Sequence, residues 1–114
     1  MKLIAEIEKA EKNGTLAEIG ISNNFYWAYK RAVECDLKYI DFDGILWDRD
    51  IDLVMNDLKR YGIKTFTISN TSTGLMGNLT AFCERGCKIS GMVTVKKYRH
   101  DDEVKSAIKL QMPR

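Results

Sequence analysis

The chain contains a single histidine, His100, and a single proline, Pro113, among its 114 residues. Histidine is a common general base and zinc ligand, so Ser–His or Cys–His catalysis and zinc binding would all depend on that one side chain. The three cysteines are an odd number without the dense spacing of a disulfide framework, which favours a reducing compartment. We therefore expect a cytoplasmic protein without the usual histidine-based catalytic centres.

Long apolar runs are also missing. No stretch approaches the roughly 20 apolar residues that a membrane span needs, and residues 1–6 lack the continuous apolar segment of a signal peptide. The composition is 45% hydrophobic and 30% charged, which is typical of globular proteins. We expect one domain over residues 1–114 and no association with a membrane.

The net charge of +2 hides an uneven distribution. Residues 1–57 carry 7 basic and 12 acidic side chains, whereas residues 58–114 carry 11 basic and 4 acidic ones. Such asymmetry is compatible with a charged binding face, although folding can interleave the two halves and cancel the field.

Hydrophobic periodicity predicts four helices and four strands in the order α-α-β-α-β-α-β-β. Stripes at helical spacing alternate with β-branched or alternating segments, and glycines follow three of the helices. Helices are expected over 2–13, 25–33 after a Ser22-Asn23-Asn24 cap, 51–61 with caps at Asp48 and Asp50, and 75–85; strands are expected over 38–42, 63–69, 87–96 and 107–112. Residues 15–21 are ambiguous, and residues 97–105 are expected to form a hairpin loop.

This order contains two strand–helix–strand units, which imply parallel strands joined by crossovers. The last strand would fold back antiparallel as part of a C-terminal β-hairpin. The sequence therefore predicts an α/β (α+β) domain with a four-stranded mixed sheet and helices packed on it. In the hairpin we expect Ile89 and Val93 on one face of their strand, and Ile108 and Leu110 pointing inward from theirs.

Residues 41–46 read D-x-D-G-x-L directly after the first predicted strand. This resembles the first motif of the haloacid-dehalogenase-like phosphotransferases. The resemblance implies Asp41 as the nucleophile, Asp43 as the acid/base and both as Mg²⁺ ligands, because a carboxylate that attacks phosphate needs a cation to neutralise its target. It also implies that Ser69, at the end of the next strand, contacts the phosphate.

The rest of the chain does not complete that site. The phosphotransferase family also needs a later lysine and a later acidic group, each at the end of its own buried parallel strand. Only 28 residues follow Gly86, and they have the pattern of a hairpin. The favoured interpretation is that Asp41 and Asp43 belong to an ordinary strand exit, without catalytic residues, metal or cofactor.

Other segments suggest binding rather than catalysis. Asn70 and Thr71 lie between a strand and a helix, where backbone N–H groups are able to hold an anion, although a plain polar turn is the commoner structure. Lys96, Lys97 and Arg99 form a basic cluster around a tyrosine, which residues 101–103 offset with three acids. Trp47 stands in a turn, either as an exposed anchor or, the favoured interpretation, as a plug for the sheet end.

Three stretches carry a resemblance to a known family. Residues 40–48, 66–87 and 107–112 are similar to a family of small uncharacterised α/β proteins of gut Firmicutes, often encoded on conjugative elements or prophages. That family has no known catalytic residues, and its pattern does not require the Asp-x-Asp-Gly signature. The resemblance implies an accessory protein of a mobile element, including an inhibitor of a host-defence enzyme.

The leading hypothesis is thus a non-catalytic protein that binds a macromolecular partner, most simply another protein. The first alternative is a small Mg²⁺-dependent phosphotransferase that uses Asp41 and Asp43. The second is a nucleic-acid-binding module that uses the basic C-terminal hairpin.

Overall fold

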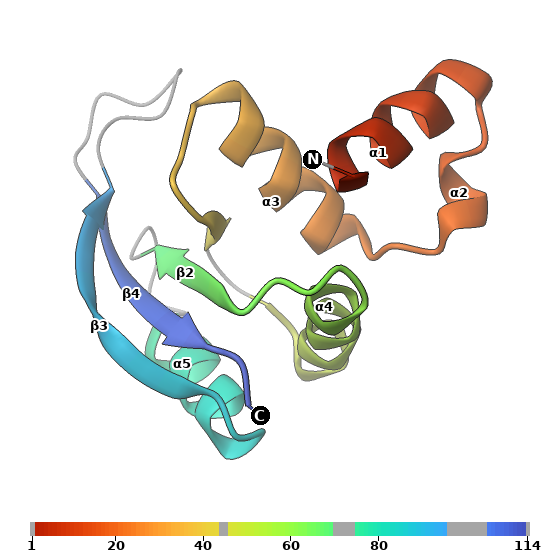
Figure 1. The fold of residues 1–114 in the computed structure, drawn as a ribbon. Helices are drawn as coiled ribbons and strands as arrows, with labels where there is room; N and C mark the ends of the chain where they lie inside the picture. The colour runs from red at the N-terminus through yellow and green to blue at the C-terminus, as the bar shows by residue number, and fades with distance from the viewer. Residues whose placement is uncertain (1, 44–45, 70–74, 96–104, 114) are drawn as a thin grey trace.

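A computed structural model of the protein describes residues 2–43, 46–69, 75–95 and 105–113 (Figure 1). Its elements are five helices and four strands. They are α1 (Lys2–Asn13), α2 (Leu16–Ile19), α3 (Asn23–Glu34), β1 (Ile40–Asp43), α4 (Asp48–Arg60), β2 (Thr65–Ser69), α5 (Leu75–Glu84), β3 (Lys88–Val95) and β4 (Lys105–Gln111). None of the helices in this described part is long and apolar enough to cross a membrane.

The four strands form one mixed sheet in the order β1-β2-β4-β3. β1 and β2 are parallel, whereas β4 is antiparallel to both of its neighbours, β2 and β3. The expected strand directions and the C-terminal hairpin are confirmed. The last strand of the chain lies inside the sheet, between β2 and the other strand of its own hairpin.

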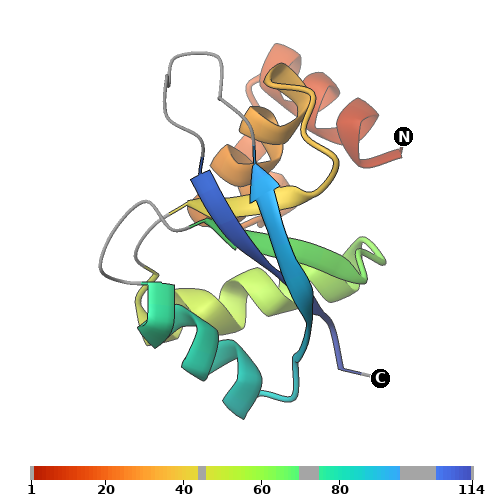
Figure 2. The same ribbon diagram turned by 90° about the vertical axis from the view of Figure 1, so that its left-hand side faces the viewer.

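Helices lie on both sides of the sheet, as Figure 2 shows, with α4 and α5 on one side and α1 and α3 on the other. α4 and α5 pack on the apolar face of the sheet. Phe66 and Ile68 of β2 are fully buried there, beside Leu110 of β4. The ring of Phe82 in α5 lies against Phe66 at 5.0 Å between centroids, and burial of these rings contributes much of the core's stabilisation.

α3 covers the edge of the sheet formed by β1 and also reaches α4. Its Phe25 ring is stacked on Tyr61 just after α4, at 6.0 Å between centroids. The backbone N–H of Ser22 donates to Asp57 Oδ2 at 2.8 Å, and the Ser22 hydroxyl accepts from the N–H of Phe25, which makes Ser22 the expected N-cap. One cluster of buried side chains therefore extends from α1 through α3 to the sheet and its helices.

Several local predictions need correction. Residues 16–19 form the short helix α2, which periodicity alone did not resolve. α4 has Trp47 as its N-cap, and Asp48 and Asp50 lie in its first turn, where carboxylates stabilise the helix dipole instead of capping. Val33 of α3, expected on the buried stripe, is 50% exposed and lines a hollow between α1 and α3.

The predicted alternation in β3 fails at a β-bulge between Ile89 and Gly91. The bulge adds a residue to β3, so Ile89 and Met92 are paired with Leu110 and Ile108 on one face, and Val93 falls on the other. Gly91 has φ of +144°, a backbone conformation that residues with a side chain rarely adopt.

Candidate functional site

Asp41 lies in the middle of β1, next to β2, and contacts two hydroxyl side chains of that strand. In the parallel register Asp41 is opposite Thr67, and Asp43 is opposite Ser69. Because side chains alternate along a strand, these positions share the face of the sheet opposite to Phe66 and Ile68. The sequence thus places a carboxylate and two hydroxyl groups side by side on one face of two parallel strands.

Both carboxylate oxygens of Asp41 accept hydrogen bonds. Oδ1 accepts from the Thr67 hydroxyl at 2.7 Å, and Oδ2 accepts from the Ser69 hydroxyl. Nη2 of Arg31, from α3, lies 3.4 Å from Oδ2 and also donates to the backbone carbonyl of Asp41. Asp41, Thr67 and Ser69 are each only 1% exposed, so this carboxylate is satisfied by the protein itself.

This geometry bears on the phosphotransferase hypothesis. The structure does bring Asp41 and Ser69 together, as that resemblance implies. However, a nucleophilic carboxylate must present a free oxygen to the phosphorus of a substrate, and the oxygens of Asp41 are buried and engaged by Thr67, Ser69 and Arg31. The arrangement is that of a polar bridge that ties β1, β2 and α3 together.

The remaining predicted site residues are only partly covered by the structure. The backbone of Asp43 belongs to β1, but its side chain is outside the described part of the molecule. Five of the predicted binding residues also lie outside the described residues: Asn70, Thr71, Lys96, Lys97 and Arg99. Among the side chains that are described, no group of three His, Cys, Asp or Glu residues is placed to hold a metal ion.

Trp47 does not plug the sheet end. Its side chain is 67% exposed at the start of α4, beside a shallow hollow of about 620 Å³ that it lines with Leu46, Asp48 and Arg49. The plug is Leu46 instead, which is buried, and its N–H donates to the Asn78 side chain of α5 at 3.2 Å. Tryptophan and arginine are enriched in the hot spots of protein interfaces, and Trp47 and Arg49 line the same hollow.

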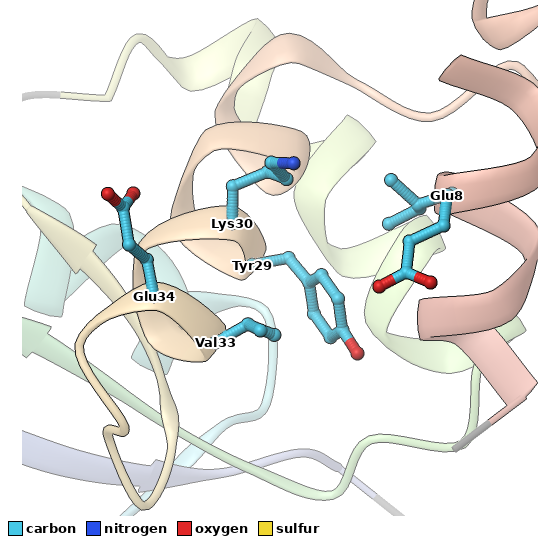
Figure 3. A pocket seen from close by; sticks show the side chains of 6 residues that line it. Glu8, Tyr29, Lys30, Val33 and Glu34 are labelled. Carbon is cyan, nitrogen blue, oxygen red and sulfur yellow. The ribbon is translucent and has the colours of Figure 1, made fainter. Parts of the chain in front are cut away.

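A second hollow lies between α1 and α3, and sequence reasoning missed it (Figure 3). It measures about 150 Å³ and is lined by Ile7 and Glu8 of α1 and by Tyr29, Lys30, Val33 and Glu34 of α3. Tyr29 falls on the predicted core stripe and is 3% exposed, so the pattern correctly predicts its burial. Nothing in the pattern indicates that its hydroxyl would reach a cleft.

Two lysine side chains, one just before β1 and one in β4, lie close to the aromatic ring of Tyr39. Nζ of Lys38 lies 5.5 Å and Nζ of Lys109 lies 5.6 Å from the centroid of Tyr39. Neither ammonium group forms an ion pair with a carboxylate of the described residues. Two cations close to one aromatic ring create a small region of positive potential.

These features define a small α+β domain with a mixed four-stranded sheet, a polar bridge between its two parallel strands and hollows beside Trp47 and between α1 and α3. The chain matches the model of the family described as Domain of unknown function (DUF7698) over residues 24–112, and it belongs to that family. The match begins at the second residue of α3, after α1 and α2, and it covers α4, α5 and the whole sheet. The comparisons with curated proteins and with solved structures give no match.

Proposed function

We propose that this protein is a non-catalytic domain that binds a partner protein through the surface around Trp47. The supporting observation is the exposure of the Trp47 indole, 67% of which is accessible in a position fixed by the buried Leu46 and by α4. Burying an exposed indole on a partner yields a large hydrophobic gain with few side-chain torsions to order. The engagement of Asp41 in the polar bridge supports binding over phosphoryl transfer.

The proposal also includes the location and the biological role of the protein. In keeping with the family that the chain resembles, we place the protein in the cytoplasm and assign it an accessory role on a mobile element, including modulation of a host-defence enzyme. Such a role requires recognition of another macromolecule and no chemistry of its own.

The test compares two exposed tryptophans. Trp47→Ala and Trp27→Ala remove indoles that are 67% and 63% exposed, so both variants should keep the melting temperature of the wild-type protein. The wild-type chain and both variants are used for quantitative affinity capture from the native host. A partner lost with Trp47→Ala and retained with Trp27→Ala supports the proposal.

Two outcomes would contradict it. One is capture of the same partners, in the same amounts, by Trp47→Ala and the wild type. The other is Mg²⁺-dependent hydrolysis of a phosphate ester that Asp41→Asn abolishes without unfolding the protein, which would instead favour the phosphotransferase.

Nucleic-acid binding is a second candidate, favoured by the pair of lysines at Tyr39. Phosphate groups would neutralise Lys38 and Lys109, and each neutralised phosphate makes the affinity depend more steeply on salt. The expected result is retention on DNA that falls steeply with salt, with a shallower slope for Lys109→Gln than for the control Lys59→Gln on α4. Retention that does not change with salt would exclude this function.

A further inference from the structure

The cleft between α1 and α3 has the size of a short side chain rather than of a cofactor. Its volume of about 150 Å³ corresponds to about five water molecules at roughly 30 Å³ each. A chain of about five non-hydrogen atoms would fill the same space. Ile7 and Val33 supply apolar contacts at the walls, so the cleft suits a ligand with an alkyl part.

Tyr29 supplies the cleft with a polar group that lacks a partner. Its ring extends from α3 toward α1, with the hydroxyl on the side of Glu8 (Figure 3). The hydroxyl is buried and has no hydrogen-bond partner among the described residues. An unpaired buried hydroxyl is unfavourable, and a ligand group that bonds to it recovers that loss.

The charge of the cleft is set by Glu8 more than by Lys30. Nζ of Lys30 donates to Glu11 Oε1 at 3.0 Å, and Oε2 of Glu11 accepts from the Tyr26 hydroxyl at 2.6 Å, so the ammonium group is already neutralised. Glu8 has no hydrogen bond or ion pair within the described part of the chain. Burial, together with the Glu8 charge, raises the pKa of Tyr29, which keeps its hydroxyl neutral.

We propose that this cleft binds a primary alkylammonium group, whose N–H donors reach the Glu8 carboxylate and the Tyr29 hydroxyl oxygen while its alkyl chain lies between Ile7 and Val33. A cation satisfies the carboxylate, and N–H donors satisfy an oxygen that has none. This site is separate from Trp47 and does not depend on the function proposed above. The same chemistry occurs in a free polyamine and in the lysine side chain of another protein.

The primary probe is n-butylammonium chloride, titrated into the full chain while the methyl signals of Ile7 and Val33 are followed by NMR. We expect saturable shifts with a millimolar dissociation constant, given the small size of the ligand. 1-Butanol, which has nearly the same shape and no charge, is expected to cause no saturable shift. Equal binding of 1-butanol would overturn the proposal.

Two variants assign the contacts. Glu8→Gln and Tyr29→Phe should each weaken n-butylammonium binding about tenfold, whereas Glu18→Gln on α2, with the same loss of charge, should not. Tyr29→Phe removes a hydroxyl without a partner, so its melting temperature should equal or exceed that of the wild type. Glu8 is exposed, so Glu8→Gln remains informative even if the tyrosine variant fails to fold. Unchanged affinity in Glu8→Gln would contradict the proposal.

Two further probes separate the sources of the ammonium group. Spermidine represents a free polyamine, and N-acetyl-lysine methylamide represents a lysine within a protein. Tighter binding of one of them identifies that source and supports the site, and failure of both to shift the Ile7 and Val33 signals rejects it.

Discussion

The Asp41 carboxylate is held by two hydroxyl donors and lies beside a guanidinium group, and this arrangement gives it a structural role. A buried carboxylate loses its hydration, and these donors compensate for that loss. Thr67 and Ser69 come from β2 and Arg31 comes from α3, so three elements meet at one side chain.

Asp41→Ala should therefore lower the free energy of unfolding by on the order of 3 kcal/mol, because it removes the carboxylate that accepts hydrogen bonds from two buried hydroxyl groups and faces the Arg31 guanidinium. Urea unfolding followed by circular dichroism measures the change. The matched control is Asp52→Ala, which removes an exposed carboxylate paired with Arg85 at 2.6 Å and should have a much smaller effect. Equal effects of the two variants would contradict the structural role.

Cys87 provides a second prediction, on pH. Burial, with a smaller contribution from Cys83, raises the pKa of the Cys87 thiol from 9.0 to about 11. The folded protein therefore holds a neutral thiol where the unfolded chain already ionises. The stability contributed by this thiol is complete below pH 9 and declines as the pH rises toward 11.

The measurement compares wild type and Cys87→Ala by urea unfolding at about pH 8.5 and about pH 10.5. The wild type should lose more stability than the variant between these two conditions, by up to about 2 kcal/mol. Tyrosines that titrate in the same range are present in both proteins and cancel in the difference. Parallel losses in the two proteins would show that the Cys87 thiol does not contribute.

Among the elements, α3 has the most demanding position, because it contacts α1, α4 and β1. Its start is fixed by Ser22, whose hydroxyl caps the helix and whose N–H is bonded to the buried Asp57 of α4. One residue thus sets both the beginning of α3 and its distance from α4.

Ser22→Ala should destabilise the protein by about 1 kcal/mol, the usual cost of a lost N-cap. Ser22→Thr keeps a hydroxyl at the cap and should cost less. Chemical denaturation gives both values. A cost for Ser22→Thr as large as that for Ser22→Ala would indicate that the hydroxyl is not the stabilising group.

Element type and strand direction were predictable because they follow from local periodicity. Phe25 and Tyr29 repeat at helical spacing, and Ile108 and Leu110 alternate, so their burial was correctly predicted. The bulge at Gly91 was not predicted, because one extra residue in β3 moves the side chains that follow it to the opposite face of the sheet without changing the composition.

The sites depended on contacts that local patterns do not contain. Motif resemblance implied that Asp41 and Ser69 contribute to one site, and the structure brings their side chains into hydrogen-bonding contact. Arg31 lies ten positions before Asp41 in a helix, and its approach to Asp41 depends on how α3 packs. The exposure of Trp47 likewise depends on Leu46 filling the space at the sheet end. Both the approach of Arg31 and the exposure of Trp47 are set by tertiary packing, which local sequence patterns do not reveal.

For the whole molecule, the position of β4 inside the sheet matters most. β4 is hydrogen-bonded to β2 on one side and to β3 on the other, so it alone connects the β1–β2 pair to β3. Its Leu110 is fully buried, whereas its register partner Ile89 on β3 is 57% exposed.

Leu110→Ala should lower the free energy of unfolding by about 2–5 kcal/mol, because it leaves a cavity at the centre of the sheet. Ile89→Ala, at the paired position on the edge strand, should cost under about 1 kcal/mol, because solvent already reaches that side chain. Thermal and urea unfolding of both variants measure the difference. Similar costs would indicate that the two strands are equally important to the core.

The interior position of β4 also has a consequence for biosynthesis. During translation, β2 emerges from the ribosome before β4, the strand that pairs with its inner edge. Until then the nascent chain exposes an unpaired edge next to the apolar side chains of Phe66 and Ile68, which invites aggregation. The nascent protein is therefore expected to be prone to aggregation until β4 has emerged and paired with β2.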